Sequence, residues 1–300
     1  MSPKRRRRDA DAIAETLLSR GKLFSDADVL EVLSRWNFRP NRNRLNVFPV
    51  GAAFVHSDTF GLVRDRRGRI DVDRYTRDRP SLFRFLAEWI KQRRPIVFNM
   101  DFPFTSISVN FNYAARLHRD GNNAGVSLSR SFGAFTGGEL TYWPNDDRRT
   151  PLELLRERDA LVVDTRDNYT LFDGCRGHRV EPFTGGDRYS LVYFTISGWT
   201  KAPSDRLPTG AVCPTEESLK YFTELLAPPR GQGNSSILVA FGKTAKAQLL
   251  YWQRANLAQV SISVLRNVAT YAEAEKSLAG VCRRFVILVP NKRPQASDRT

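Results

Sequence analysis

A series of short, β-branched and aromatic runs between about residues 95 and 200 constrains the fold more than any other feature of the chain. The runs are IVFNM, SISVNFNY, GVSLSRSF, ELTYW, ALVVD, YTLF, HRVEPF and RYSLVYFTIS. Glycine, aspartate, asparagine and proline residues separate them. Many short strands with such turns between them are typical of a sandwich or jelly roll, not of a parallel α/β sheet. We therefore predict a mainly β core.

The segments on either side of this core have a different texture. Residues 10–36 read as two short helices, and Ser25-Asp26-Ala27-Asp28 resembles a capping sequence before the second one. The pair is typical of a small packing hairpin, with a helix-turn-helix as the alternative. A polar, proline-containing linker is expected over residues 37–46, and a further helix around Ser81–Gln92.

After Pro203, strand-like runs such as SILVAF and RFVILVP alternate with helical stretches, which is typical of a small α/β unit. The chain is therefore expected to have three parts. Residues 1–46 form a basic tail with short helices, residues 47–202 form the core, with its jelly roll from about residue 95, and residues 203–300 form an accessory α/β domain.

Positive charge is concentrated at the two ends of the chain. The net charge is +15, with a balance of +10 over residues 1–94, −2 over 95–200 and +7 over 201–300. Basic surfaces attract polyanions through phosphate neutralisation and counterion release, so we predict a nucleic-acid partner, DNA before RNA. The basic run Lys4–Arg8 suits a nuclear address or a phosphate-binding arm, with a disordered tail as the alternative.

Cysteine usage and hydropathy bear on the compartment. Three cysteines without paired spacing fit neither a disulfide framework nor a cysteine-rich zinc site. The sequence contains no run of eighteen apolar residues, so a membrane span is not expected. The charged start is not followed by an apolar stretch, which argues against a secretory signal. A reducing intracellular compartment, nuclear or cytoplasmic, is expected.

The stretch LHRDGNN contains two of the three side chains that we expect to bind a metal. If residues 117–120 lie at the end of a strand, His118 and Asp120 project to the same side. A third ligand must come from elsewhere in the fold, and His178 in the strand-like stretch GHRVEPF is available. Two histidines and one carboxylate on one face, with three positions open, form the facial triad of non-haem Fe(II) oxygenases.

Arg188 supplies a second signal, ten residues after His178. A guanidinium inside a barrel strand is costly to bury without a partner, and a dicarboxylate would provide one through a bidentate contact. Ser190 lies two residues further on, hence on the same face. The alternative is an ordinary arginine that pairs with Asp187 or Glu181.

With these residues in place, the sequence resembles the iron(II)- and 2-oxoglutarate-dependent dioxygenases over roughly residues 100–200. The resemblance lies in His118-x-Asp120, FGAFTGGELTYW (132–143) and GHRVEPFTGGDRYSLVYFT (177–195). Within that superfamily, HRDGNNAGVSLSRSFGAFTGGEL looks most like the TET/JBP group, which oxidises methyl groups on thymine or 5-methylcytosine in nucleic acid. Prolyl hydroxylases share the GGEL and the distal histidine and arginine.

The resemblance implies a double-stranded β-helix, with Fe(II), 2-oxoglutarate and dioxygen as cofactor and cosubstrates. It implies that His118, Asp120 and His178 hold the iron and that Arg188 and Ser190 bind the distal carboxylate of 2-oxoglutarate.

Asn112 (or Asn110) and Arg116 are further candidates for binding the cosubstrate. Asn123, Asn122 and Phe132 are candidates for substrate binding. The alternative for the asparagines Asn110 and Asn112 is a strand-end structural role, for Arg116 a solvated surface position, and for Phe132 the core.

Three functions are consistent with the sequence. The first is a dioxygenase that hydroxylates a methyl group on a nucleic-acid base. The second is a protein hydroxylase of the prolyl type, and the third is a non-catalytic nucleic-acid-binding protein on a degenerate jelly roll. The intact ligand set and Arg188 argue against the third.

Overall fold

A nine-stranded, mostly antiparallel sheet forms the centre of the protein. The computed structural model describes residues 2–93, 98, 100–166, 168–226, 239–242 and 288–289. The strand order is β1-β2-β4-β12-β5-β9-β13-β14, and β3 pairs with β2. The strands are β1 (Pro40–Asn41), β2 (Val55–Arg64), β3 (Ile70–Val72), β4 (Ser106–Phe111), β5 (Asn123–Phe132), β9 (Asn168–Phe172), β12 (Tyr189–Ile196), β13 (Val239–Gly242) and β14 (Leu288–Val289).

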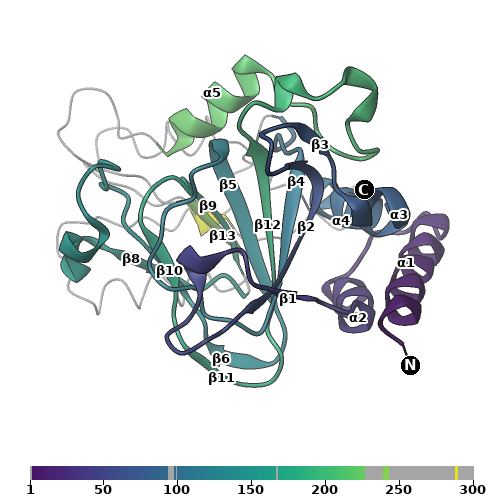
Figure 1. Ribbon diagram of the computed structural model, residues 1–300, viewed down its shortest axis with the longest axis horizontal. Helices are drawn as coiled ribbons and strands as arrows, with labels where there is room; N and C mark the ends of the chain where they lie inside the picture. The colour runs from purple at the N-terminus through teal and green to yellow at the C-terminus, as the bar shows by residue number, and fades with distance from the viewer. Residues whose placement is uncertain are drawn as a thin grey trace, which may run out of the picture.

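Smaller sheets and helices flank the main sheet. One small sheet contains β8 (Leu161–Val163), β7 (Leu140–Tyr142) and β10 (His178–Val180), and another contains β6 (Phe135–Gly137) and β11 (Phe183–Gly185). The α-helices are α1 (Pro3–Ser19), α2 (Asp26–Arg35), α3 (Arg74–Asp78), α4 (Pro80–Gln92) and α5 (Glu216–Leu225). In Figure 1, α1–α4 lie to the right of the main sheet, and the smaller sheets lie to its left and below it.

The β-rich core with flanking helices agrees with the coarse fold prediction. Most of the expected runs contain a strand: SISVNFNY contains β4, GVSLSRSF lies within β5, and RYSLVYFTIS contains β12. The helix expected over Ser81–Gln92 is α4. The run IVFNM lies largely outside the described residues, and the double-stranded β-helix itself stays a prediction at this level.

Side-chain alternation gives the main sheet two chemically different faces. Successive strand residues point to opposite faces, and in β5 Val126, Leu128 and Phe132 join the hydrophobic core while Ser127 and Ser129 point the other way. The same alternation places further core residues on the helix side of the neighbouring strands: Phe60, Ile107, Val109, Leu171, Leu191 and Tyr193. The opposite face is polar, which prepares it to bind a polar ligand.

The two N-terminal helices complete the layer on the apolar face. Ala10, Ala14, Leu17, Val29 and Leu33 all lie in the same core as α4, so the pair serves as a packing hairpin. The expected cap of the second helix is present, because the Ser25 hydroxyl accepts from the Asp28 N–H and the Asp28 carboxylate accepts from the Ser25 N–H.

The basic run Lys4–Arg8 is part of α1 and not a disordered tail. Arg7 is buried, and its guanidinium lies 5.4 Å from the ring centroid of Trp36 and 5.0 Å from that of Tyr75. It also donates to the carbonyl of Asn37. The charge of Arg7 therefore stabilises the helix hairpin, and only its neighbours face solvent.

The described part of the predicted 203–300 unit packs against the core. Leu219 of α5 lies close to Gly125 of β5, and β13 pairs with β9 from Val239 opposite Leu171 to Gly242 opposite Asn168. The remainder of the predicted accessory unit lies outside the described residues. Within the described ranges, no helix has the length and apolar character needed to cross a membrane.

A pair of glycines allows a test of how tightly the sheet is built. Gly61 in β2 has φ +93°, and a Cβ there would lie 2.2 Å from the carbonyl oxygen of Thr105, whereas Gly68 has φ +80° and open space around it. Both alanine variants acquire the strain of a positive φ, about 1 kcal/mol. Gly61→Ala adds a backbone clash, so we expect it to lose about 3 kcal/mol or more in urea unfolding. Equal losses for the two variants would contradict this packing.

Candidate metal and anion site

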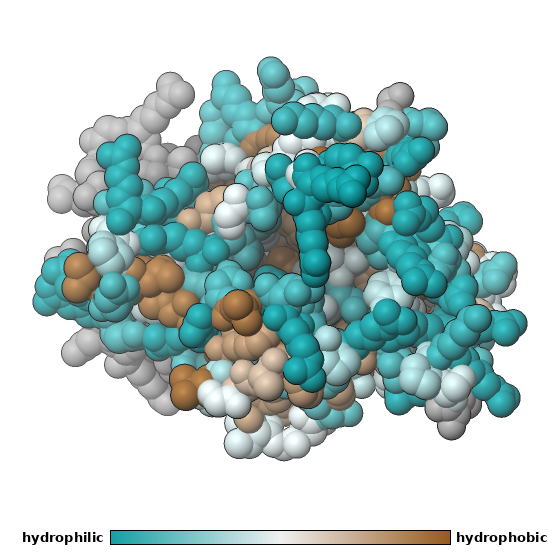
Figure 2. Space-filling view, viewed as in Figure 1, coloured by the Kyte–Doolittle hydropathy of each residue, from teal (hydrophilic) through white to brown (hydrophobic). Residues whose placement is uncertain are grey.

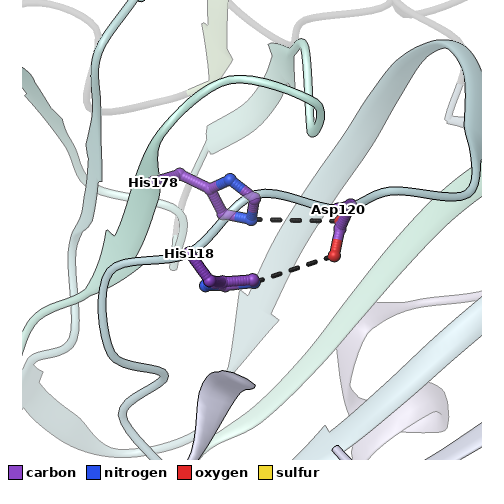
Figure 3. A group of neighbouring side chains, drawn as sticks. All are labelled: His118, Asp120 and His178. Carbon is purple, nitrogen blue, oxygen red and sulfur yellow. Dashed lines mark ion pairs between the residues drawn. The ribbon is translucent and has the colours of Figure 1, made fainter. Parts of the chain in front are cut away.

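His118, Asp120 and His178 converge on one point, as the sequence predicted (Figure 3). The Nε2 atom of His118 lies 3.7 Å from Oδ1 of Asp120, and the Nε2 atom of His178 lies 4.0 Å from Oδ2. The candidate ligand atoms all lie within 4.8 Å of one another. Separations of this size leave room for one ion at about 2 Å from each ligand atom.

Backbone pairing between the two histidines creates this convergence. The N–H of each donates to the carbonyl of the other at 3.0 Å, and the two ring centroids are 4.2 Å apart. His178 begins β10, which pairs with β7, while the Asp120 N–H donates to the Gly174 carbonyl at 2.8 Å. Ligands sixty residues apart in the chain thus share one rigid hydrogen-bonded unit.

Each imidazole is fixed in the form that binds a metal through Nε2. The Nδ1 atom of His118 lies 2.8 Å from the Arg116 carbonyl, and that of His178 lies 2.9 Å from the Arg176 carbonyl. A carbonyl accepts only, so Nδ1 carries the proton and the Nε2 lone pair faces Asp120. Burial, followed by the neighbouring His178, lowers the pKa of His118 to about 3, so this ring is neutral at pH 7.

The donor set fits a divalent first-row metal. Two neutral imidazoles and one carboxylate on one face match the ligands that non-haem Fe(II) sites use, with positions left open. The carboxylate of Asp120 is held in place by the Asn123 amide at 3.3 Å and by Arg44 at 3.8 Å. A Cβ at Gly174 would lie 2.8 Å from the Asn123 amide nitrogen and 3.0 Å from the Asp120 carboxylate, so a larger residue there would displace these two side chains.

Arg119, between two of the ligands, points away from the metal site, as the strand alternation predicts. Its guanidinium contacts the Asp146 carboxylate at 2.7 and 2.6 Å. Asp146, whose side chain is 0% exposed, also accepts from the Gly177 N–H at 2.6 Å. One buried carboxylate therefore ties the chain between His118 and Asp120 to the residue that precedes His178.

The three candidate metal ligands line a cavity of about 550 Å³ on the polar face of the main sheet. Cavities of this size are typical of small-molecule sites. The face shown in Figure 2 is hollowed near its centre. The polar and charged residues that line the cavity are Asn41, Asn43, Arg44, Asn46, Thr59, Arg64, Ser108, Asn110, Tyr113, His118, Asp120, Asn122, Asn123, Ser129, Thr165, His178, Arg188 and Ser190. Asp120 is the only acidic residue among them.

Arg188 lines the same cavity and has no acidic partner among the described residues. It is 4% exposed, and its guanidinium donates to the Ser131 hydroxyl at 2.9 Å and to the Gly138 carbonyl at 3.0 Å. Its Nε has no hydrogen-bond partner in the described part of the chain, and no carboxylate there lies within 4.0 Å of its guanidinium. Burial lowers its pKa to about 10, so it stays charged at pH 7.

The alternative that Arg188 pairs with Asp187 or Glu181 does not agree with the structure. The Asp187 carboxylate accepts from the Asn112 amide at 2.6 Å, and the Glu181 carboxylate accepts from Arg179 at 2.8 Å. A buried guanidinium whose Nε has no partner and beside which no carboxylate lies, within the described ranges, is suited to bind an anion.

The other predicted cosubstrate residues are only partly brought to the cavity. Ser190 lines it and accepts from the Asn110 amide at 3.2 Å. Asn112, at φ 47°, is not among the lining residues and instead accepts from the Arg188 backbone N–H at 2.6 Å. Arg116 also does not line the cavity, and its side chain donates to the carbonyls of Asn46 and Leu45. Both therefore support neighbouring segments, whereas Asn110 is among the residues that line the cavity.

Two of the three predicted substrate residues line the cavity. Asn122 and Asn123 lie beside Asp120 at its edge, and Asn123 also donates to the Ser127 hydroxyl. Phe132 is buried on the opposite face of the sheet, with its ring centroid 5.3 Å from that of Trp89. The structure places Phe132 in the hydrophobic core, which was the alternative for the aromatic residues.

Sequence reasoning missed Arg44, Asp146 and Gly174. Arg44 belongs to the segment expected to be a linker, which pairs with β2 through β1 and crosses the cavity. Its run of asparagines and arginines gave no sign of this location. Asp146 and Gly174 act through single contacts across the fold, and spacing in the sequence does not carry such information.

Comparisons with known proteins give little beyond this geometry. No family model matches the chain, and no curated protein matches it. Among solved structures, NgTET1 in complex with 5mC DNA is 17% identical, over 56% of this chain and 69% of that one, with a TM-score of 0.36. A 2OG-Fe(II) oxygenase family protein from Burkholderia pseudomallei is 15% identical, over 57% and 80%, with the same TM-score. Scores this low carry no argument about function.

Asp146 offers a test of the metal site. Asp146→Ala removes the tie between the two ligand segments, and loss of such supporting contacts weakens metal affinity by about ten- to a hundredfold. The measurement is Mn(II) binding by calorimetry. The matched control is Asp147→Ala, which removes an exposed carboxylate that accepts from the backbone N–H groups of Arg149 and Thr150. A folded Asp146→Ala protein with unchanged Mn(II) affinity would exclude this supporting role.

Proposed function

We propose that this protein is an Fe(II)- and 2-oxoglutarate-dependent dioxygenase with the main and smaller sheets arranged as a double-stranded β-helix. The observation that carries the proposal is the presence, in one cavity, of the His118–Asp120–His178 set and the buried, unpaired guanidinium of Arg188. A metal site alone is compatible with many reactions. A metal site together with a buried cation is complementary to a ligand that is anionic at one end and can chelate a metal at the other.

2-Oxoglutarate has this chemistry. Its distal carboxylate suits the fork of Arg188, whose position is fixed by Ser131 and by the close packing of Gly138. Ser190 adds a hydroxyl on the same wall. The other end of the molecule, a keto acid, offers two oxygens to a metal held by His118, Asp120 and His178.

When bound, Fe(II) with 2-oxoglutarate and dioxygen supplies the oxidising power needed to hydroxylate a C–H bond. The residues of this chain supply the rest. The backbone-fixed imidazoles keep their Nε2 lone pairs aimed at one point, and Asn123 orients Asp120. The apolar side chains Val192 and Phe194 line the cavity alongside these polar groups and limit the water in it.

For the substrate, we propose a methyl group on a nucleic-acid base, with DNA favoured over RNA. The charge of +15 supports a polyanionic partner. The exposed residues that line the cavity include Asn43, Asn46 and Asn122, and amide groups pair well with the edges of bases. A base in a duplex must leave the stack to reach a buried metal site.

Turnover tests this proposal. Succinate release is measured with Fe(II), 2-oxoglutarate and oligonucleotides that contain 5-methylcytosine or thymine, beside a panel of peptides. We expect release to depend on the methylated oligonucleotide and to fall to background in His118→Ala. Turnover on peptides alone would point to a protein hydroxylase, and failure to bind iron and 2-oxoglutarate would leave a non-catalytic binding protein.

Replacement of Arg188 tests the cosubstrate separately. Arg188→Met keeps an unbranched apolar stem and removes two charge-assisted hydrogen bonds to the ligand, worth about 3 kcal/mol or more together. We therefore expect 2-oxoglutarate affinity to fall about a hundredfold or more. Arg158→Met, at an exposed position, is the control and retains the affinity.

A further inference from the structure

We propose that four basic side chains beside the cavity mouth bind the phosphate backbone of the nucleic acid whose base enters the cavity. These residues, Arg64, Arg66, Arg67 and Lys201, are called the basic rim. The inference rests on the nucleic-acid substrate proposed above and says which surface holds that substrate. It does not depend on the identity of the base.

Arg64 connects the rim to the cavity. It ends β2, is exposed and lines the cavity. Its guanidinium donates to the carbonyl and the hydroxyl of Ser197 at 2.8 and 3.2 Å. Both partners are neutral, so the contact fixes the position of the guanidinium and leaves its charge uncompensated.

Lys201 lies on the same side. A Cβ at Gly198 would lie 3.5 Å from the Arg64 guanidinium and 3.9 Å from Cδ of Lys201, so the two cations flank this glycine. Ser197, which holds Arg64, also connects this side to the candidate metal site. Its backbone N–H donates at 2.7 Å to the carbonyl of Asn122, which lies two residues after Asp120.

The turn between β2 and β3 presents Arg66 and Arg67 on a rigid base. The Asp65 carboxylate accepts from the backbone N–H groups of Arg67 and Arg69 at 2.8 and 2.9 Å, and from the Arg69 side chain at 2.8 Å. Arg69 thereby neutralises Asp65. Arg66 and Arg67 are exposed and form no ion pair among the described residues.

Asp71, the next acidic residue along the chain after Asp65, is also paired. Asp71 of β3 lies 3.5 Å from Arg77 and 3.1 Å from Arg206. Hydrophilic side chains gather around β3 in Figure 2. The net positive charge of the rim is therefore available to an external anion.

Three cations on the opposite side of the metal site are compensated internally. Arg119 pairs with Asp146, Arg148 with Asp173, and Arg179 with both Glu157 and Glu181. Unlike these three, Arg64, Arg66 and Arg67 form no ion pair among the described residues, which favours the β2–β3 side as the approach for a polyanion. One fixed guanidinium, that of Arg64, together with neighbouring exposed cations suits a chain of phosphates with bases attached.

The test compares oligonucleotide binding by two double variants of the full chain. Arg66→Gln/Arg67→Gln changes the rim without altering a cavity-lining residue. Arg149→Gln/Arg158→Gln makes the same charge change at exposed positions between β7 and β8. Affinity for a fluorescent single-stranded or duplex oligonucleotide is measured by anisotropy over a range of salt concentrations, with 2-oxoglutarate binding as a check on the cavity.

Each phosphate contact contributes about 0.7 to 0.9 to the slope of log affinity against log salt concentration. We expect the rim variant to lower this slope by about 1.4 to 1.8, and the control variant to leave it unchanged. 2-Oxoglutarate affinity is unchanged in both. Equal slopes for the rim and control variants would overturn the rim while leaving the proposed dioxygenase intact.

Other outcomes separate the two proposals. A wild-type protein that binds 2-oxoglutarate but no oligonucleotide would refute both the nucleic-acid substrate and the rim. An acidic peptide that binds through the rim in place of oligonucleotides would assign the surface to a protein partner and overturn this inference.

Discussion

The two-residue alternation of the main sheet is the constraint on which the site depends. It sends Phe60, Ile107 and Leu191 into the helix layer and Ser108 and Ser190 toward the cavity. A one-residue slip in β12 would bury its polar side chains against the helices and expose its core residues. The apolar packing on one face therefore determines where the polar groups lie on the other.

The site combines two buried electrostatic features, each of which is unfavourable in free energy when it has no ligand. The imidazoles of His118 and His178 lie side by side, and burial holds the pKa of His118 low. Arg188 is buried without an acidic partner in the part of the chain that the structure describes. A divalent metal and a carboxylate ligand would relieve both conditions, and the hydrogen bonds that Asp146 and Gly138 accept from neighbouring segments fix both groups beforehand.

The sequence predicted the parts of this site that follow local periodicity. His118 and Asp120 lie two residues apart at one strand end, and Arg188 and Ser190 are also separated by two residues, so the common direction of each pair was predictable.

Phe132 and Asn112 show the limit of such predictions. An aromatic or an amide at a strand position suits either the core or the cavity, and long-range packing decides which of the two it enters. Arg44 was not identified because the course of the segment around it depends on its pairing with β2 through β1. The assignment of residues 203–300 to an accessory α/β unit stays a prediction.

The central claim is that one ligand bridges the metal site and Arg188. Such a ligand couples the two sites, and the coupling is reciprocal. The direct measurement is the affinity for 2-oxoglutarate under anaerobic conditions with and without Mn(II), together with Mn(II) affinity with and without 2-oxoglutarate. We predict that each ligand tightens the other about tenfold or more, by the same factor, and that the coupling is lost in Arg188→Met. Independent binding of the two ligands, or full coupling in Arg188→Met, would contradict the claim.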